Sequence, residues 1–182
     1  MSAASRSLPA MTLRHATRPS RLGPIAWVAE GEEVLGIYFV GHWRKPQRAT
    51  AGVEAAPDDP VVERAAGELD EWLEGDRRAF DFGWRLDGSD LERSVWALLL
   101  EIPYGETTTY GALARRLGNP HLAQEVGRCV GENPLSIVVP CHRVVGADGS
   151  LTGYAGGLER KAFLLDLEGY LTGRTLLDPR IA

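Results

Sequence analysis

Two apolar runs close to the N-terminus place the strongest constraint on how this chain can fold. Ile25–Ala29 and Val34–Val40 are rich in β-branched and aromatic residues, and the polar segment Glu30-Gly31-Glu32-Glu33 separates them. Strand-like runs joined by a short connection that contains glycine are typical of a β-hairpin. The region from 23 to 42 therefore predicts two paired strands.

A helix is predicted after a loop over 44–60 that is rich in Arg, Pro and Ala. Apolar residues recur there at helical spacing, and Gly75 offers a stop. These residues are Val61, Ala65, Leu69, Trp72 and Leu73. The aromatic segment Phe80–Trp84 suggests a further strand. We therefore predict a small α+β domain over 23–87.

The second half of the chain has helical patterns. Ser89 followed by Glu92 is a capping-box signature, and the helix that it opens ends at Pro103-Tyr104-Gly105. The apolar stripe of this helix is Leu91, Val95, Leu98 and Ile102. Two short helices are expected next, Tyr110–Leu117 and His121–Val130, with Gly118-Asn119-Pro120 as the break between them. This is a helix-turn-helix pattern, but helical hairpins are common, so it does not by itself establish DNA binding.

The last part of the chain is predicted to be a strand, a loop and a helix. Ile137–Val139 has the composition of a short buried strand, and the loop from 146 to 157 contains five glycines. A final helix is expected over 158–168, with Gly169 as its end.

Composition limits the possible partners and compartments. The formal net charge of −5 counts against a DNA partner, although 109–143 contains four arginines and only two carboxylates, so one face can be basic. No apolar stretch approaches the roughly 18 residues that cross a bilayer, which indicates no membrane partner. Two cysteines outside any zinc-ligand spacing predict free thiols, no metal, no cofactor and a cytoplasmic location. Residues 1–22 lack a clear amphipathic period, so we expect a disordered tail rather than an organelle-targeting peptide.

Cys141 is the residue with the clearest chemical potential. It follows an apolar run and Pro140, and His142 and Arg143 come directly after it, so the thiol lies where the chain turns polar. Nearby positive charge favours the nucleophilic thiolate, but a structural thiol is an equally acceptable interpretation from the residues alone. If His142 acts as a base it needs an orienting acceptor. The candidates are Asp148, Glu159, Asp166 and Glu168.

Five motifs, in this order along the chain, resemble the O6-alkylguanine-DNA alkyltransferases. They are Ile102-Pro103-Tyr104-Gly105-Glu106-Thr107-Thr108-Thr109-Tyr110, Gly118-Asn119-Pro120, Glu132-Asn133-Pro134, Pro140-Cys141-His142-Arg143-Val144-Val145-Gly146 and Gly153-Tyr154-Ala155-Gly156-Gly157. The match runs from 89 to 169, with looser agreement over 23–87. It implies an α+β fold with a ribonuclease H-like sheet-and-helix domain over 23–87. A mostly helical, winged-helix-like domain with the helix-turn-helix would follow over 88–172, with a tail over 173–182.

The resemblance also implies DNA repair by direct reversal, in which Cys141 accepts an alkyl group from guanine O6 irreversibly and once per molecule. His142 would deprotonate Cys141 through a water, and Glu168 would orient the imidazole. Tyr110 would turn the nucleotide out of the duplex and donate a proton toward guanine N3, and Asn133 would hold the turn beneath the cysteine. The substrate-binding residues would be Val144, Tyr154 and Ala155, with the carbonyl of Cys141.

The implied partner is double-stranded DNA that contains O6-alkylguanine, bound through its minor groove by a monomer. The DNA-binding residues would be Tyr110, Gly111, Asn119, Ala123, Gln124, Gly127, Arg128, Gly131 and Arg143. Members of this family usually carry an arginine where this chain has Gln124, which lacks the charge and the stacking plane of a guanidinium. Arg128, one turn later, could partly compensate.

Three other functions are compatible with parts of the pattern. A non-catalytic damage-recognition protein of the alkyltransferase-like type would replace the acceptor cysteine, so Cys141 argues against it. A helix-turn-helix regulator could use the same thiol as an alkylation or redox sensor. A Cys-His hydrolase is disfavoured because His142 lies unusually close to Cys141 in sequence.

Overall fold

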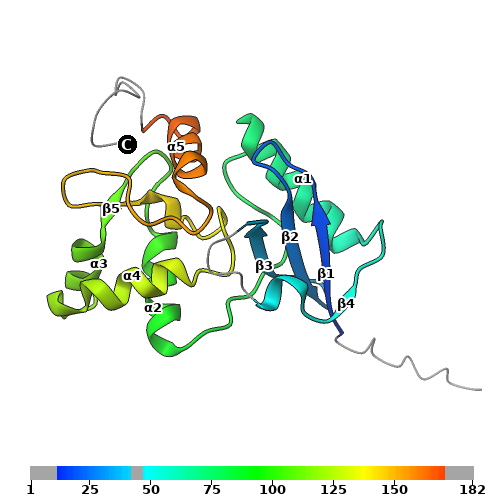
Figure 1. The fold of residues 1–182 in the computed structure, drawn as a ribbon, viewed down its shortest axis with the longest axis horizontal. Coiled ribbons are helices and arrows are strands. Elements are labelled where there is room, and N and C mark those ends of the chain that lie inside the picture. The colour runs from blue at the N-terminus through cyan, green and yellow to red at the C-terminus, as the bar shows by residue number, and fades with distance from the viewer. Residues whose placement is uncertain (1–11, 42–46, 171–182) are drawn as a thin grey trace, which may run out of the picture.

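A computed structural model describes residues 12–41 and 47–170 of the chain. It is a mixed α+β structure in which a four-stranded sheet and helix α1 lie on one side and helices α2 to α5 on the other (Figure 1). The predicted α+β class is therefore confirmed. Buried side chains from both sides form one large hydrophobic cluster, from Ala16 in the sheet to Leu164 in α5.

The sheet has the strand order β3-β2-β1-β4. Its strands are β1 (Leu13–Arg18), β2 (Ile25–Glu30), β3 (Glu33–Phe39) and β4 (Val53–Glu54). The first three pair antiparallel, and β4 pairs parallel with β1. The predicted hairpin is β2–β3, and Gly31 takes the positive φ of 59° that its tight connection requires.

The prediction that residues 1–22 are a disordered tail is wrong for the described part of that segment. Strand β1 pairs with β2 along its full length, from Leu13 opposite Glu30 to Arg18 opposite Ile25. Strand β1 has few apolar residues, so its sequence does not predict a strand. Backbone hydrogen bonds to β2 and ion pairs stabilise it instead. Arg14 bonds to Asp59, which lies just before α1. Residues 1–11 lie outside the described residues.

Helix α1 (Pro60–Glu74) confirms the predicted helix, and Asp59 caps it by accepting the amides of Val61 and Val62. Its apolar face packs against β2 and β3. Gly75 ends the helix in the left-handed conformation, with φ of 89°.

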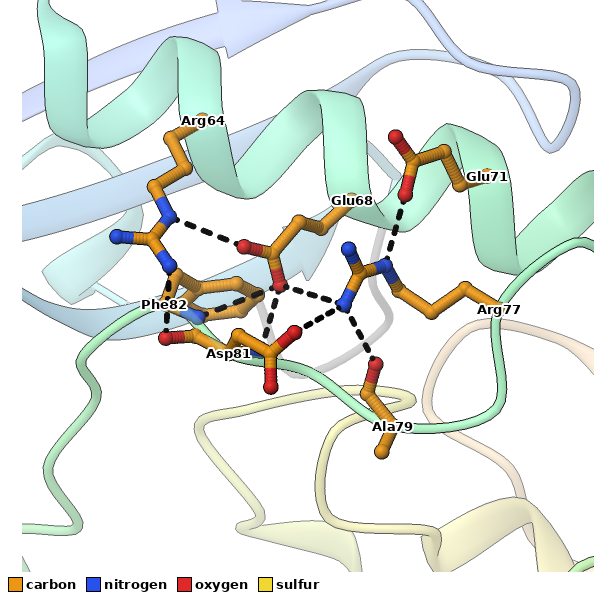
Figure 2. A network of polar contacts seen from close by, with 7 residues as sticks. All are labelled: Arg64, Glu68, Glu71, Arg77, Ala79, Asp81 and Phe82. Carbon is orange, nitrogen blue, oxygen red and sulfur yellow. Dashed lines mark hydrogen bonds and ion pairs between the residues drawn. The ribbon is translucent and has the colours of Figure 1, made fainter.

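The prediction of a strand at Phe80–Trp84 is wrong, except for one isolated pairing of Trp84 with Val34. Figure 2 shows the reason. Buried Glu68 of α1 accepts the amides of Asp81, at 2.7 Å, and Phe82, at 3.3 Å. A carboxylate therefore takes the hydrogen bonds that a neighbouring strand would have taken. Arg64 and Arg77 balance the charge of this buried carboxylate.

The second half contains α2 (Asp90–Leu100), α3 (Tyr110–Arg116), α4 (Ala123–Gly131) and α5 (Leu158–Leu167). Short elements connect them: the strands β5 (Thr108–Thr109) and β6 (Val144–Val145), and the 3-10 helices η2 (Pro120–Leu122) and η3 (Cys141–Arg143). A further 3-10 helix, η1 (Gln47–Thr50), lies in the first half, before β4. The capping box of Ser89 and Glu92 is present. Helices α3 and α4 pack together as the predicted helix-turn-helix. The buried face of α2 is Val95, Trp96 and Leu99, whereas the predicted Leu91 and Leu98 are half-buried.

The prediction of a strand at Ile137–Val139 is also wrong. The segment is a tight turn closed by Val139 N–H to Leu135 O, and Ile137 has the strained φ of 75°. The residues before it pair instead with the edge of β3: Ile37 donates to Pro134 O at 2.8 Å, and Ser136 donates to Ile37 O. The N-terminal sheet thus holds the segment that leads to Cys141.

Among residues 12–41 and 47–170, no helix is long and apolar enough to cross a membrane. The same residues contain no group of three or more His, Cys, Asp or Glu side chains that could hold a metal ion.

Candidate active site and nucleic-acid interface

Cys141 is the first residue of η3 and is 5% exposed. Its amide donates to Val139 O at 2.8 Å, and its carbonyl accepts from Val144 N–H. The tight turn at 135–139 and the 3-10 helix hold the backbone on both sides of the thiol. The nucleophile candidate therefore sits on a rigid corner of the chain rather than in a strand.

Asn133 contacts the sulfur directly. Its side-chain amide donates to Cys141 Sγ at 3.0 Å and to Val139 O at 2.8 Å, while its Oδ1 accepts from Leu135 N–H at 3.0 Å. One buried amide thus closes the turn and supplies a donor to the thiol. Such a donor favours the thiolate over the thiol.

The structure selects Glu168 from the four candidate acceptors for His142. His142 Nε2 lies 3.0 Å from Glu168 Oε1, and both side chains are fully buried. Gly105 N–H also donates to this carboxylate, at 3.2 Å. Because an ionised carboxylate can only accept, the proton of a neutral imidazole lies on Nε2. His142 Nδ1 is then the acceptor, and it has no hydrogen-bond partner among the described residues.

Arg143 is not placed where the sequence interpretation expected it. Its guanidinium is turned inward, with Nη2 at 2.6 Å from Glu168 Oε1 and Nη1 at 2.6 Å from Ile102 O. The buried carboxylate attracts the charge more strongly than solvent does, because it would otherwise be unpaired. The expected DNA contact of Arg143 is therefore corrected to an internal ion pair.

Burial and hydrogen bonding set the ionisation of this cluster. Burial raises the pKa of the Cys141 thiol, against the opposing effects of the Asn133 amide and the Lys161 charge. Burial also lowers the pKa of His142, although Glu168 opposes this. Burial disfavours ionisation of Glu168, but hydrogen bonds from His142 and Arg143 outweigh it and lower its pKa to about 2. The resting site thus pairs a protonated thiol with a neutral imidazole and an ionised carboxylate.

Lys161 is a site residue that the sequence interpretation missed. It lies fully buried in α5, and its ammonium donates to Val144 O at 2.5 Å and to Thr152 O at 2.7 Å. Burial lowers its pKa to about 8. The signal was present, because Lys161 lies three and four positions before Leu164 and Leu165 and so shares the inner face of the helix with these two buried residues.

The first half of the chain also reaches the site, through Trp72 of α1. Its ring lies edge-on to the imidazole of His142, with centroids 6.2 Å apart and planes at 74°. It makes a similar edge-on contact with Tyr104 and stacks on Phe80. Nothing in the sequence near Trp72 distinguishes it from the other core residues of α1, so pattern analysis could not identify this contact.

Tyr110 connects the helix-turn-helix with the glycine loop. Its hydroxyl lies 3.4 Å from both Thr152 O and Gly153 O, and its ring lies against α4 at Gly127, where an added Cβ would be 3.6 Å from the ring. Burial raises the pKa of Tyr110. Tyr154 of the same loop is buried, and its hydroxyl has no hydrogen-bond partner among the described residues. Ala155 is half-buried beside it. The predicted substrate-binding residues Tyr154 and Ala155 thus share one loop, whereas Val144 lies in β6, where Lys161 joins its carbonyl to Thr152 of that loop.

The exposed surface of the helix-turn-helix is hollowed by a cavity of about 510 Å³. His121, Gln124, Glu125, Gly127 and Arg128 line it. Four of the other predicted DNA-binding residues, Gly111, Asn119, Ala123 and Gly131, are exposed or half-buried on α3, α4 and the turn between them. Gln124 is exposed, so the position that carries arginine in the family is accessible.

This surface is less positive than the residue count suggested. Arg128 pairs with Glu125 at 2.8 Å and with Glu92 at 3.1 Å, and Arg116 pairs with Glu101. Together with buried Arg143, three of the four arginines between 109 and 143 are held by carboxylates. Arg128 must leave its partners before it can contact a phosphate.

Known proteins are similar to this chain in sequence and in fold. Residues 90–170 match the family described as 6-O-methylguanine DNA methyltransferase, DNA binding domain. A methylated-DNA–protein-cysteine methyltransferase of Methanosarcina acetivorans is 41% identical over 150 residues, which cover 82% of this chain and 94% of the relative. The Mycobacterium tuberculosis enzyme of the same name is 38% identical over 156 residues, covering 86% and 92%.

Solved structures agree with the sequence relatives. The crystal structure of Mycobacterium tuberculosis OGT in complex with DNA superposes with a TM-score of 0.78 at 37% identity, covering 92% of this chain and 98% of that one. These proteins belong to the class of methyltransferases that act on methylated DNA and a protein cysteine. The chain belongs to the methylated-DNA–protein-cysteine methyltransferase family. The alternative of a helix-turn-helix regulator is not favoured by these relatives.

Proposed function

We propose that this protein repairs alkylated DNA by moving the alkyl group of O6-alkylguanine onto Cys141. The observation that carries the proposal is the direct contact of Cys141 Sγ with Asn133, beside a buried His142–Glu168 pair. This arrangement supplies an acceptor for the thiol proton and a donor for the resulting thiolate. A structural cysteine would need neither.

The proton of Cys141 leaves through His142 Nδ1, by way of a bridging water, as the sulfur becomes the nucleophile. Glu168 keeps the imidazole in the tautomer that can accept and stabilises the imidazolium that forms. The thiolate then attacks the alkyl carbon in line, the carbon–O6 bond breaks, and its electron pair stays on the guanine. Tyr110 donates a proton toward guanine N3 and so neutralises the developing charge.

The reacting guanine must leave the base stack, because an atom inside a duplex cannot reach a thiol that is 5% exposed. We propose that α4 enters the minor groove, where Ala123, Gly127 and Gly131 permit a close approach, and that Gln124 fills the vacated space. The carbonyls of Cys141 and Val144 accept from the guanine amino group, each with a lone pair beyond its intramolecular bond. The amide of Ala155 donates to O6.

Each molecule acts once, because a thioether is stable and the site contains no second thiol that could displace it. Cys129, the other cysteine, is buried in α4, where its sulfur accepts from Arg128 at 3.7 Å. The protein is therefore a transferase by reaction and a stoichiometric reagent by turnover.

We also propose finer descriptions of the two halves. The sheet order β3-β2-β1-β4, with β4 parallel to β1, supports a ribonuclease H-like domain over 23–87, extended to include β1. The α3–α4 pair lies in the chain between β5 and β6, which pair with each other, and this arrangement supports a winged-helix-like domain over 88–172.

Mass spectrometry after incubation with O6-methylguanine duplex DNA tests this function. We expect one methyl group on Cys141 of the parent and of Cys129→Ser, and none on Cys141→Ser. The lesion should disappear in a one-to-one ratio with methylated protein. Loss of the lesion with no protein adduct, or an intact lesion with the folded parent, would disprove the proposal.

A further inference from the structure

Arg160, near the start of α5, joins the glycine loop to the N-terminal half of the protein. Its Nε donates to Leu22 O at 2.7 Å, and its Nη1 donates to Gly156 O at 2.7 Å. The guanidinium also lies over the ring of Phe39 in β3, 4.8 Å from its centroid. One side chain thus bonds two backbone carbonyls that are 134 residues apart in the chain and belong to different halves.

The loop that Arg160 holds is the one proposed to receive the alkylguanine. Gly156 packs so closely on Phe39 that an added Cβ would lie 2.5 Å from the ring, and Tyr154 meets the same ring edge-on, with centroids 6.2 Å apart. The back of the loop therefore rests on β3. Its front carries Gly153, where Tyr110 O–H approaches.

A cavity of about 690 Å³ lies beside this contact, between the N-terminal turn and the loop. Its lining includes Arg21, Leu22 and Gly41 on one side, and Tyr154, Ala155 and Gly156 on the other. Arg160 is part of the lining as well. Without the two hydrogen bonds of Arg160, the loop has space beside its contact with β3 into which it can move.

We propose that Arg160 is a positioning residue that sets the width of the alkyl-binding pocket by tying Gly156 to Leu22. The inference rests on the proposed function, and it concerns which alkyl groups are accepted rather than whether transfer occurs. A loop held forward fits a small alkyl group, and a released loop admits a longer one. Only a planar guanidinium donates in two fixed directions at once, so lysine is an incomplete replacement.

The experiment compares transfer from O6-methylguanine and O6-butylguanine in one duplex sequence. Arg160→Met keeps an unbranched apolar side chain beside Phe39 but removes both donors. We expect its butyl-to-methyl rate ratio to rise about three- to tenfold over the parent, since pocket contacts of this size discriminate by such factors. Hydrogen exchange of the loop amides over 153–157 should quicken. Arg64→Met, which removes an equal charge from α1, should leave both measurements unchanged.

Arg160→Lys should give an intermediate ratio, and it carries the test if Arg160→Met does not fold. An unchanged ratio with unchanged loop exchange overturns the proposal. An equal fall of both rates with faster loop exchange also overturns it, because the loop would then move without changing which alkyl group is accepted. If the parent transfers neither group, the proposed function fails, whereas the exchange measurement still reports whether Arg160 holds the loop.

Discussion

Trp72 and His142 are in edge-to-face contact across the two halves of the protein, with ring centroids 6.2 Å apart. The indole comes from a helix of the N-terminal half, and the imidazole is the proposed base. Together with Tyr104, which also contacts the indole, Trp72 shields the imidazole of His142 from solvent. Burial lowers the pKa of His142, so the contact helps to keep the base in its unprotonated form.

Trp72→Leu should move the acid limb of the pH–rate profile upward. Water admitted to the corner raises the pKa of His142, with Glu168 adding to the rise and Arg143 and Lys161 opposing it. A protonated imidazole cannot accept the thiol proton, so the rate should fall at low pH and change little at high pH. We expect a shift of about one pH unit. Single-turnover rates between about pH 5 and pH 9 measure it, and Trp72→Phe, which keeps a ring edge, should shift less. Superimposable profiles for parent and Trp72→Leu would refute this role.

Glu168→Gln should reduce both the transfer rate and the stability, because it leaves the Arg143 guanidinium buried without its carboxylate. The pKa of Glu168 is about 2 in the fold and ordinarily 4.5, so its stabilisation is complete above the ordinary pKa and is lost as pH falls toward 2. This linkage corresponds to about 3 kcal/mol. Urea unfolding should show that difference near neutral pH and a smaller one at about pH 3. Glu159→Gln, on the exposed face of the same helix, is the control, and a pH-independent difference contradicts the linkage.

Asn133→Ala should raise the pKa of Cys141 further, because the sulfur loses the donor at 3.0 Å. It also leaves Val139 O and Leu135 N–H without their partner, which costs about 1–3 kcal/mol in stability. The rate of alkylation by iodoacetamide as a function of pH reports the thiol pKa. Asn133→Asp should give a larger rise, since it adds a negative charge beside the thiolate. A profile that does not move in either variant would show that Asn133 acts only on the turn.

Gln124→Arg should increase the rate of transfer from duplex DNA. A guanidinium adds a charge and a plane that can stack in the space vacated by the flipped base. We expect a gain of about three- to tenfold on a methylated duplex and little gain on the same lesion in single-stranded DNA, where no flipping is needed. No gain on the duplex would eliminate the idea that Gln124 limits base flipping.

Glu125→Gln should strengthen binding to DNA, because it removes the nearer of the two carboxylates that hold Arg128, at 2.8 Å, and leaves only Glu92, at 3.1 Å. A more available cation adds up to about one phosphate contact, so the affinity should rise about three- to tenfold at low salt, with a steeper salt dependence. Fluorescence anisotropy with an undamaged duplex measures both quantities. Glu74→Gln, at the far end of α1, makes the same change in net charge and should have no effect. Equal gains in the two variants would mean that only the overall charge matters.

Local sequence was sufficient where an element is held by its own residues. The hairpin β2–β3, the capped helices α1 and α2, and the α3–α4 pair each carry their periodicity and their stop signals in one short segment. Local sequence did not predict the structure where a group distant in the chain takes the backbone hydrogen bonds of a segment. At 80–84 the buried carboxylate of Glu68 accepts backbone amides, and the segment is irregular rather than a strand. Strand β1 pairs with β2 although its sequence contains few apolar residues.

The candidate site divides in the same way. The order of motifs around Cys141 led to a family and to a set of residues, from which the sequence alone could identify the nucleophile, its neighbouring base and the departure at Gln124. The family resemblance already implied Glu168 as the partner of His142, and the structure agrees by placing the two side chains 3.0 Å apart. Only the tertiary structure decided that Arg143 points inward, and that Trp72, Lys161 and Arg160 belong to the surroundings of the site. The reason is physical: hydrogen-bond partners and burial depend on which segments meet in space, and a one-dimensional pattern records only which residues can make such contacts.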